Sequence, residues 1–528
     1  MTTATADHDT PPTERKKSAL QRRAALLRML LPHVPHLMLR STSHLLSLSP
    51  QSSYWDLKTT VIIEFLRSYL QQPSTRPPQT VEKIQANTTQ RVKVAPDTWC
   101  LDVDYSAPEG FNGELAVREA IVQLGGEEKA IWKTGVAPLS AEWVAARSVE
   151  LHGPAPEQEA QQIYNDMMAD VKQKETVVLY LHGGAYTMLD PSSHRSVVIN
   201  ICRTASCRAF VPRYRLAPQT PFPGAIIDAL ISYLYLLDPP ANACHTAVKP
   251  EHIVFAGDSA GGGLSLALTQ LLLQLRRTNT TISWNGKDIL VPLPAGVALL
   301  SSWCEVARCF GTLGDFPEGS EDVCGIFDYL PSPQSAARAV HLPSPIWNPE
   351  LMRERGQTQM YCPDALMTNP LASPLLAESW EGAPPVWMSI GDECLRDSNY
   401  YLAWRFREQG VKCRLERYIA MPHVFQGVVQ HAEASKMAWE RMGGFVGAMT
   451  RGETKEEGYW GAVSIHPRSL EEEGMEIEGL KVKGMELGDV KKMVERGVER
   501  YREIAESCRG ETREVGEGVK AAVGMSKI

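Results

Sequence analysis

Residues 253 to 263 read Ile-Val-Phe-Ala-Gly-Asp-Ser-Ala-Gly-Gly-Gly, and this stretch decides the fold. Its first half is a short apolar run typical of a buried strand, and a helical pattern begins directly after it. Gly257, Ser259 and Gly261 form a G-x-S-x-G motif at the junction. Glycine lets neighbouring backbone approach without a Cβ clash, which suits a cramped turn that lifts a serine hydroxyl clear of a sheet. The stretch therefore predicts a strand, a nucleophile elbow and a helix, with Ser259 as the nucleophile.

Two other motifs each follow a strand-like run. Residues 182 to 186 read His-Gly-Gly-Ala-Tyr, and residues 421 to 425 read Met-Pro-His-Val-Phe. A serine hydroxyl is a weak nucleophile and needs a base within hydrogen-bond reach, so His423 is the candidate base. Negative charge that grows on a carbonyl oxygen during attack is best held by preformed N–H donors. We expect this oxyanion hole to consist of the amides of Gly183, Gly184 and Ala260.

A third group, a carboxylate, is needed to fix the histidine tautomer. Residues 391 to 397 read Gly-Asp-Glu-Cys-Leu-Arg-Asp and follow an apolar strand-like run. Asp397 is expected to cap a helix over 399–408, which leaves Asp392 and Glu393. The residues alone leave the choice between these two open.

Continuous apolar runs alternate with helical segments along the middle of the chain. Such runs are typical of strands buried on both faces of a parallel sheet, and they occur at 176–181, 210–214, 253–256, 295–300 and 386–390. The stretches 99–105 and 143–151 alternate apolar with polar residues, which predicts half-exposed antiparallel strands at a sheet edge. We therefore expect an α/β fold with a mostly parallel twisted sheet and helices on both faces.

Composition narrows the class of protein. The chain has 528 residues, with 54 basic and 62 acidic side chains and a net charge of −8, so nucleic acid is not an expected partner. Its eleven cysteines show no C-x-x-C spacing, so we expect reduced thiols and neither a zinc site nor a disulfide framework. The polar start of the chain does not resemble a signal peptide, and no run is long enough to cross a bilayer. An intracellular protein, cytoplasmic or peripheral to a membrane, is expected.

The chain divides into three expected parts. Residues 1–45 are predicted to be a disordered and basic amphipathic segment, which either lies on a membrane surface or packs on its own protein. Residues 46–450 form the predicted catalytic domain, with lid elements at 46–80 and 305–368; a helix within the first of these is either a lid or a core helix. Residues 451–528 are rich in Glu, Lys, Arg and Gly and are expected to be a charged extension with no chemistry.

Together these motifs resemble the hormone-sensitive-lipase-like family of α/β-hydrolases, also called the α/β-hydrolase fold-3 group. The resemblance covers roughly residues 174–450. It is carried by His-Gly-Gly-Ala-Tyr at 182–186, Tyr-Arg-Leu-Ala-Pro at 214–218, Phe-Pro-Gly-Ala-Ile-Ile-Asp at 222–228, Gly-Asp-Ser-Ala-Gly-Gly at 257–262, Asn-Pro-Leu-Ala-Ser-Pro at 369–374, and the Leu-Arg-Asp and Met-Pro-His blocks. The helix that starts near Trp55 and the long loops also look like fungal members such as steryl acetyl hydrolases.

The resemblance implies an α/β-hydrolase fold with a lid built from N-terminal helices and insertions, and hydrolysis of carboxylic esters without a cofactor. Relatives commonly show Asp-Pro-Leu-Arg-Asp with the first Asp as the triad acid. Aligning Leu395-Arg396-Asp397 on that pattern puts Glu393 in its place, so the expected triad is Ser259, His423 and Glu393, with Asp392 as the alternative acid. The expected substrate is a short or medium acyl ester of a small or lipid-like alcohol, including acetylated sterols. A silent small-molecule-binding member of the fold, or an amidase or lactonase using the same triad, is the alternative.

Overall fold

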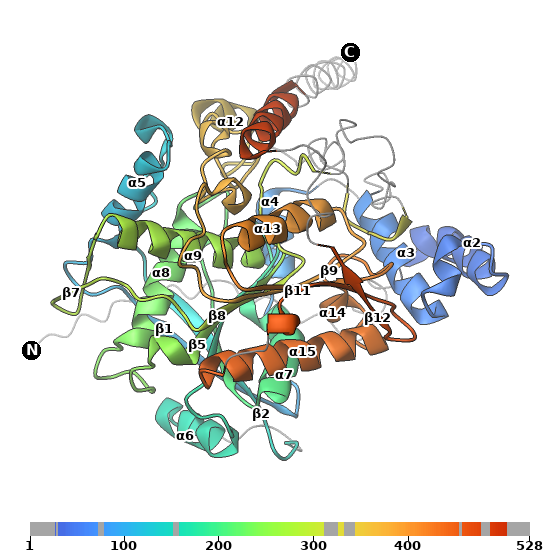
Figure 1. The fold of residues 1–528 in the computed structure, drawn as a ribbon, viewed down its shortest axis with the longest axis horizontal. Helices are drawn as coiled ribbons and strands as arrows, with labels where there is room; N and C mark the ends of the chain where they lie inside the picture. The colour runs from blue at the N-terminus through green and yellow to red at the C-terminus, as the bar shows by residue number, and fades with distance from the viewer. Residues whose placement is uncertain are drawn as a thin grey trace, which may run out of the picture.

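A computed structural model describes residue 27 and residues 30–71, 79–151, 158–310, 326–331, 344–453, 457–476 and 486–503. Its centre is a sheet of ten strands in the order β1-β2-β4-β3-β5-β8-β9-β10-β11-β12 (Figure 1). The seven strands from β4 to β11 in this order run parallel to one another, while the pairs β1–β2, β2–β4 and β11–β12 are antiparallel. The prediction of an α/β-hydrolase fold with a mostly parallel sheet is confirmed.

The strands lie close to the predicted runs. Their bounds are β1 Thr98–Tyr105, β2 Leu139–Ala146, β3 Val177–Leu181, β4 Arg208–Pro212, β5 Ile253–Asp258, β8 Gly296–Leu300, β9 Val386–Gly391, β10 Cys413–Tyr418, β11 Gly461–Ile465 and β12 Glu472–Met475. The small hairpin of β6 (Ile282–Trp284) and β7 (Lys287–Ile289) is separate. β1 and β2 pair antiparallel at one edge, as expected, although β2 ends at Ala146 rather than at residue 151.

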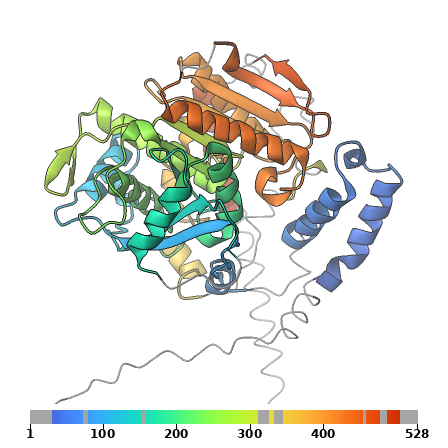
Figure 2. The same ribbon diagram turned by 90° about the horizontal axis from the view of Figure 1, so that it is seen from below.

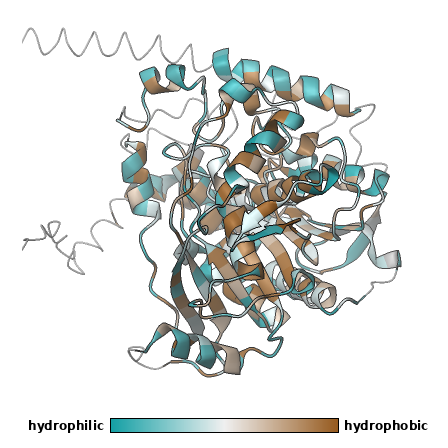
Figure 3. Ribbon diagram, turned by 90° about the vertical axis from the view of Figure 1, so that its left-hand side faces the viewer, coloured by the Kyte–Doolittle hydropathy of each residue, from teal (hydrophilic) through white to brown (hydrophobic). Residues whose placement is uncertain are grey.

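Helices cover both faces of the sheet, and the residues of β3 show how. Val177, Leu179 and Leu181 join one core cluster, whereas Val178 and Tyr180 join another, because successive side chains point to opposite faces of a strand. Below the sheet in Figure 1 lie α7 (Pro191–Ala205) and α15 (Glu433–Thr450). Above it lie α8 (Gly224–Leu237), α9 (Ala260–Arg277) and α13 (Arg396–Glu408). Apolar residues accordingly concentrate on the central strands (Figure 3).

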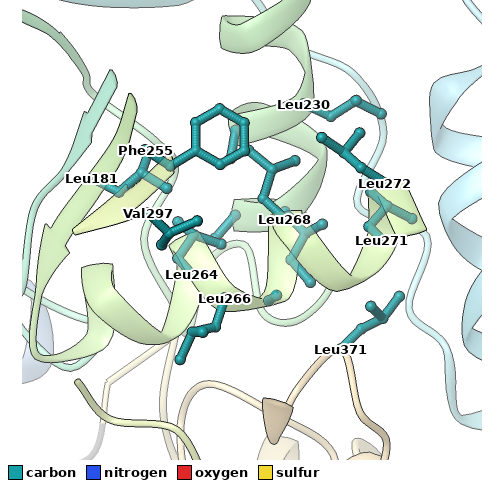
Figure 4. Packing of buried hydrophobic residues seen from close by; sticks show 14 of the residues in the cluster. Leu181, Leu230, Phe255, Leu264, Leu266, Leu268, Leu271, Leu272, Val297 and Leu371 are labelled. Atoms are coloured by element: carbon teal, nitrogen blue, oxygen red, sulfur yellow. The ribbon is translucent and has the colours of Figure 1, made fainter. Parts of the chain in front are cut away.

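Helix α9 follows the elbow directly and is buried along almost its whole length. Its side chains Leu264 and Leu268 lie near Phe255 of β5 and Val297 of β8, while Leu272 lies beside Leu230 of α8 (Figure 4). Leucines at steps of three and four residues form one stripe, and burying each is worth about 2 kcal/mol. This packing holds the start of α9, and therefore Ser259, rigidly on the sheet.

The remaining helices are shorter or peripheral. They are α2 (Val34–Leu45), α3 (Leu57–Gln71), α4 (Val81–Thr88), α5 (Gly113–Gln123), α6 (Ala160–Asp170), α12 (Pro349–Glu354) and α14 (Phe425–Val428), together with a helix over 487–503. Helices α2 and α3 form a hairpin at one side of the molecule (Figure 2). Of the segment 1–45, expected to be disordered and basic amphipathic, Leu31–Leu45 is helical, while most of residues 1–29 lies outside the described part.

The chain beyond residue 450 also needs a correction. Strand β11 pairs in parallel with β10, and β12 pairs with β11, so residues 461–475 extend the main sheet. Within the helix 487–503, Val490 and Val494 are fully buried in the larger core cluster. The helix packs in this way because its apolar residues recur at a helical spacing within the charged stretch. The described residues beyond 450 are therefore part of the same folded domain, and residue 450 is not a domain boundary.

Cysteine usage also differs from the expectation in one place. Cys394 is disulfide-bonded, while eight other described cysteines are free thiols. Within the described part of the chain, no group of three His, Cys, Asp or Glu side chains is arranged to hold a metal ion.

Candidate active site

The elbow between β5 and α9 has the geometry that the motif predicts. Ser259 has φ 51° and ψ −121°, a conformation that a non-glycine residue adopts only when its surroundings impose it. Its N–H donates to the carbonyl of Leu300 at 2.9 Å, and its own carbonyl accepts from Trp303 at 2.8 Å. A Cβ on Gly261 would lie 1.9 Å from the carbonyl oxygen of Leu181. Only glycine fits there, so the turn is as tight as a nucleophile elbow requires.

The backbone beside His423 is bound at the end of β8, where the backbone of Ser259 is also bound. The N–H of Val424 donates to Oγ of Ser301 at 3.0 Å, and Ser301 follows Leu300, the residue that accepts from the Ser259 amide. The backbones that carry His423 and Ser259 therefore meet at the end of β8. His423 itself is buried, whereas Ser259 is partly exposed.

Glu393 is the carboxylate in contact with His423. Its Oε2 lies against Nδ1 of the imidazole, and its Oε1 accepts the N–H of Gly391 at 3.2 Å. Burial lowers the pKa of His423, but the charge of Glu393 and its hydrogen bond outweigh this and raise the pKa above its usual value. A carboxylate at Nδ1 leaves Nε2 as the ring nitrogen for a serine hydroxyl.

Asp392 has a different set of partners. Its carboxylate accepts from Nε of Arg417 at 2.8 Å, from the N–H of Ala420 at 2.8 Å and from Arg396 at 3.3 Å. Burial raises the pKa of Asp392, but the bonds to Arg417 and Ala420 outweigh it, so the net shift is downward. This residue ties β9 to β10 and does not face the imidazole. Asp397, expected as a helix cap, instead lies in the first turn of α13, which begins at Arg396 after Leu395.

Asp258, next to the serine, is a structural carboxylate. Its Oδ1 accepts from Tyr180 at 2.6 Å and from the N–H of Gly183 at 3.1 Å, and lies 3.4 Å from Nε2 of His194. Burial raises the pKa of Asp258, but the nearby His194 and the hydrogen bonds lower it to about 2. The sequence motifs did not predict a role for His194, because this residue lies in α7, outside all of the motifs.

The contact with Asp258 changes the expected oxyanion hole. The amide of Gly183 donates to a carboxylate, so it is not free to hold a developing oxyanion, and this part of the prediction is corrected. The amides of Gly184, Ala185 and Ala260 have no hydrogen-bond acceptor among the described residues. Gly184 and Ala185 are also partly exposed, unlike Gly183. Gly184 has φ +109°, and a Cβ there would lie 2.2 Å from the carbonyl of Met188, so glycine is required at the turn.

Asp328 is a site residue that the sequence did not indicate. It is fully buried, accepts the N–H of His423 through Oδ1 at 3.2 Å and accepts the N–H of Cys394 through Oδ2 at 2.8 Å. It therefore connects the loop of the base to the loop of Glu393. Asp328 lies in the irregular stretch expected to be a lid, where no periodic pattern points to any single residue.

The fold and this site define a class of protein, the carboxylesterase and lipase-like hydrolases of the α/β-hydrolase fold. Residues 178–427 match the family model described as alpha/beta hydrolase fold. The chain is 27% identical over 280 residues to an acetyl-hydrolase of Streptomyces hygroscopicus. The aligned region covers 53% of this chain and 78% of that protein. It is 25% identical over 255 residues to carboxylic ester hydrolase LipN of Mycobacterium tuberculosis, covering 48% of this chain and 58% of LipN.

Other matches are shorter or concern the fold. Carboxylesterase/phospholipase LipF of Mycobacterium tuberculosis is 42% identical over 96 residues, which is 18% of this chain and 24% of LipF. The crystal structure of the protein EstE5 soaked with p-nitrophenyl butyrate has a TM-score of 0.48 and 25% identity, and covers 75% of this chain and all of that one. Residues 178–427 are therefore an alpha/beta hydrolase domain, and the chain resembles proteins of the hormone-sensitive-lipase-like family. The likeness to fungal steryl acetyl hydrolases stays a prediction.

Proposed function

We propose that the chain hydrolyses carboxylic esters with short or medium acyl groups through an acyl-enzyme on Ser259. One observation carries this proposal. A serine on a strained elbow and a histidine in contact with a buried carboxylate are fixed to the same end of β8, together with three amides that have no acceptor in the described part of the chain. Nothing in this arrangement requires a cofactor. Acetyl esters, including those of sterols or other lipid-like alcohols, are our expected substrates, because the Streptomyces relative bears the name acetyl-hydrolase.

The first half of the reaction acylates the serine. Oγ of Ser259 attacks the ester carbonyl carbon while Nε2 of His423 takes its proton, and Glu393 stabilises the imidazolium that forms. The amides of Gly184, Ala185 and Ala260 hold the negative carbonyl oxygen. The carbon–oxygen bond to the alcohol then breaks, and the imidazolium donates its proton to the departing alcohol oxygen.

The second half returns the enzyme to its starting state. Water attacks the acyl carbon, again losing a proton to His423, and the bond to Oγ of Ser259 breaks as that oxygen regains the proton. The carboxylic acid leaves. An amidase or a lactonase would run through the same steps with a different leaving group, so substrate tests must include amides and lactones.

The test is labelling with a fluorophosphonate together with a series of p-nitrophenyl esters of increasing acyl length. Wild type should be labelled and should prefer the shorter esters, and Ser259→Ala should lose both labelling and turnover by at least about 10³-fold. Labelling that survives the substitution would remove Ser259 from its role. A correctly folded wild type with neither labelling nor turnover would favour the alternative, a catalytically silent binding protein. The expected intracellular location and peripheral membrane contact of the N-terminal segment also remain proposals.

A further inference from the structure

In the helix hairpin of α2 and α3, the α2 segment turns its polar side chains toward α3 and its apolar side chains outward, whereas α3 buries apolar side chains such as Ile63 in the core. Three histidines of the first helical segment face α3: His33 bonds Ser68 at 2.8 Å, His36 bonds Glu64 at 3.0 Å, and His44 bonds Thr60 at 2.9 Å. Glu64 is buried between Arg67, at 2.7 Å, and Arg40, at 3.5 Å. A helix on a water-facing surface normally shows the opposite pattern, with its apolar stripe turned inward.

The outward residues of this hairpin are mostly leucines. Within residues 31–48 the exposed apolar side chains, each more than a third exposed, are Leu31, Val34, Met38, Leu39, Leu45, Leu46 and Leu48, and we call this set the leucine face; Leu57 and Val61 of α3 are exposed to a smaller extent. Met38 and Leu39 are each 66% exposed and Leu48 is 73% exposed. Scattered exposed leucines are ordinary, but seven exposed apolar side chains within residues 31–48 are typical of an interaction surface.

Charge indicates what covers this face. Between Glu14 and Asp56 the sequence has no acidic residue, and its basic residues there are Arg15, Lys16, Lys17, Arg22, Arg23, Arg28 and Arg40. The whole chain carries −8, so this segment has the opposite sign to the rest. Apolar side chains in a basic stretch of sequence match a bilayer with anionic headgroups, because leucines enter the acyl boundary while Lys and Arg meet lipid phosphates. A second copy of the same basic segment would be repelled.

We propose that the leucine face docks the protein on an anionic phospholipid surface. This goes beyond ester hydrolysis and does not require it. Among the described helices none is long and apolar enough to cross a membrane.

The hairpin is also connected to the candidate active site. Arg67 of α3 donates to the carbonyls of Asp328 and Ile326 at 3.0 and 2.9 Å, and Asp328 in turn holds the backbone of His423. Trp55 donates to the carbonyl of Ala420, three residues before His423, at 2.7 Å. A docked hairpin therefore brings the loop of the base near the lipid surface, where an ester of a lipid-like alcohol is concentrated.

The test is sedimentation of the full-length protein with vesicles of phosphatidylcholine, with and without phosphatidylserine. We expect wild type to sediment with the mixed vesicles and to be released by high salt. The variant Met38→Gln/Leu39→Gln/Leu46→Gln should bind at least about tenfold more weakly, because it removes apolar groups that insert. The matched control Leu115→Gln/Val149→Gln changes exposed apolar residues elsewhere, 58% and 76% exposed, and should bind like wild type.

Two further measurements separate the alternatives. Ser259→Ala should sediment like wild type, and the triple variant should hydrolyse a soluble p-nitrophenyl ester at the wild-type rate, so docking and hydrolysis fail independently. Replacing Arg15, Lys16, Lys17, Arg22 and Arg23 by Gln should weaken binding; stronger binding would mean that the N-terminal segment covers the leucine face and would overturn the proposal. Wild type that stays in solution with both vesicle types would also overturn it, as would a dimer that dissociates in the triple variant without any vesicle binding.

Discussion

The side chain of Asp328 accepts the backbone N–H of His423 at 3.2 Å, although the two residues are 95 positions apart. The other oxygen of the same carboxylate accepts the N–H of Cys394, which follows Glu393. One buried side chain thus sets the separation of the two loops that bring imidazole and carboxylate together. We regard Asp328 as a positioning residue, because it touches the backbone of these loops and not the reacting atoms.

Asp328→Asn should lower kcat by about 10- to 100-fold with little change in KM, since small displacements of a catalytic group cost rate more than binding. The Asn side chain has only one acceptor oxygen. Its NH2 group would therefore lie against the N–H of either Cys394 or His423, and that hydrogen bond would be lost. Steady-state kinetics with p-nitrophenyl acetate measure the effect. Asp397→Asn, a change of a nearby partly buried carboxylate bound to Arg396, is the matched control and should keep kcat. Equal losses in both variants would contradict the positioning role.

Replacing Glu393 should mainly lower activity, whereas replacing its neighbour Asp392 should mainly lower stability. Glu393→Gln should lower kcat by about 10⁴-fold, because the imidazolium formed during attack loses its stabilising charge. Asp392→Asn should keep most of the activity but lower the free energy of unfolding by about 1–3 kcal/mol, because Arg417 loses a charged acceptor. Ester kinetics and urea unfolding of both variants give the comparison. The reverse ranking in kcat would assign the triad acid to Asp392.

The pH dependence of kcat/KM should report the raised pKa of His423. A general base acts in its neutral form, so activity is lost as pH falls through the pKa of the histidine. Because Glu393 raises that pKa, the acid limb should lie above pH 6.5, the usual value for histidine. In Glu393→Gln the residual activity should show its acid limb at lower pH. An acid limb of wild type at or below pH 6 would argue against the contact of Glu393 with His423 in solution.

Asp258→Asn should destabilise the protein in a pH-dependent way. The folded-state pKa of Asp258, about 2, lies below the unfolded value, so its contribution is present above about pH 4 and is lost as pH falls toward 2. The variant lacks this contribution at every pH. The difference in unfolding free energy between wild type and variant should therefore be smaller at pH 3 than at pH 6, as measured by urea unfolding. A difference that grows on acidification would exclude an ionised Asp258 in the folded state.

The sequence by itself determined the elements that depend on local pattern. The run from Ile253 to Gly263 predicts the strand, the elbow and the helix, because spacing, glycine and periodicity act over a few residues. The continuous apolar runs predicted the parallel strands for the same reason, and the order of Ser259, a carboxylate and His423 predicted the components of the candidate site. Each of these signals lies within one segment of the chain.

Only the tertiary structure decided which groups face one another. Asp392 and Glu393 are neighbours with the same chemistry, and the bend that follows β9 turns one toward Arg417 and the other toward His423. The amide of Gly183 is taken by Asp258, Asp328 arrives from a stretch without periodicity, and β11 joins the sheet from a charged region. These are contacts between residues far apart in the chain, and their partners are chosen by packing of the whole core rather than by any local preference.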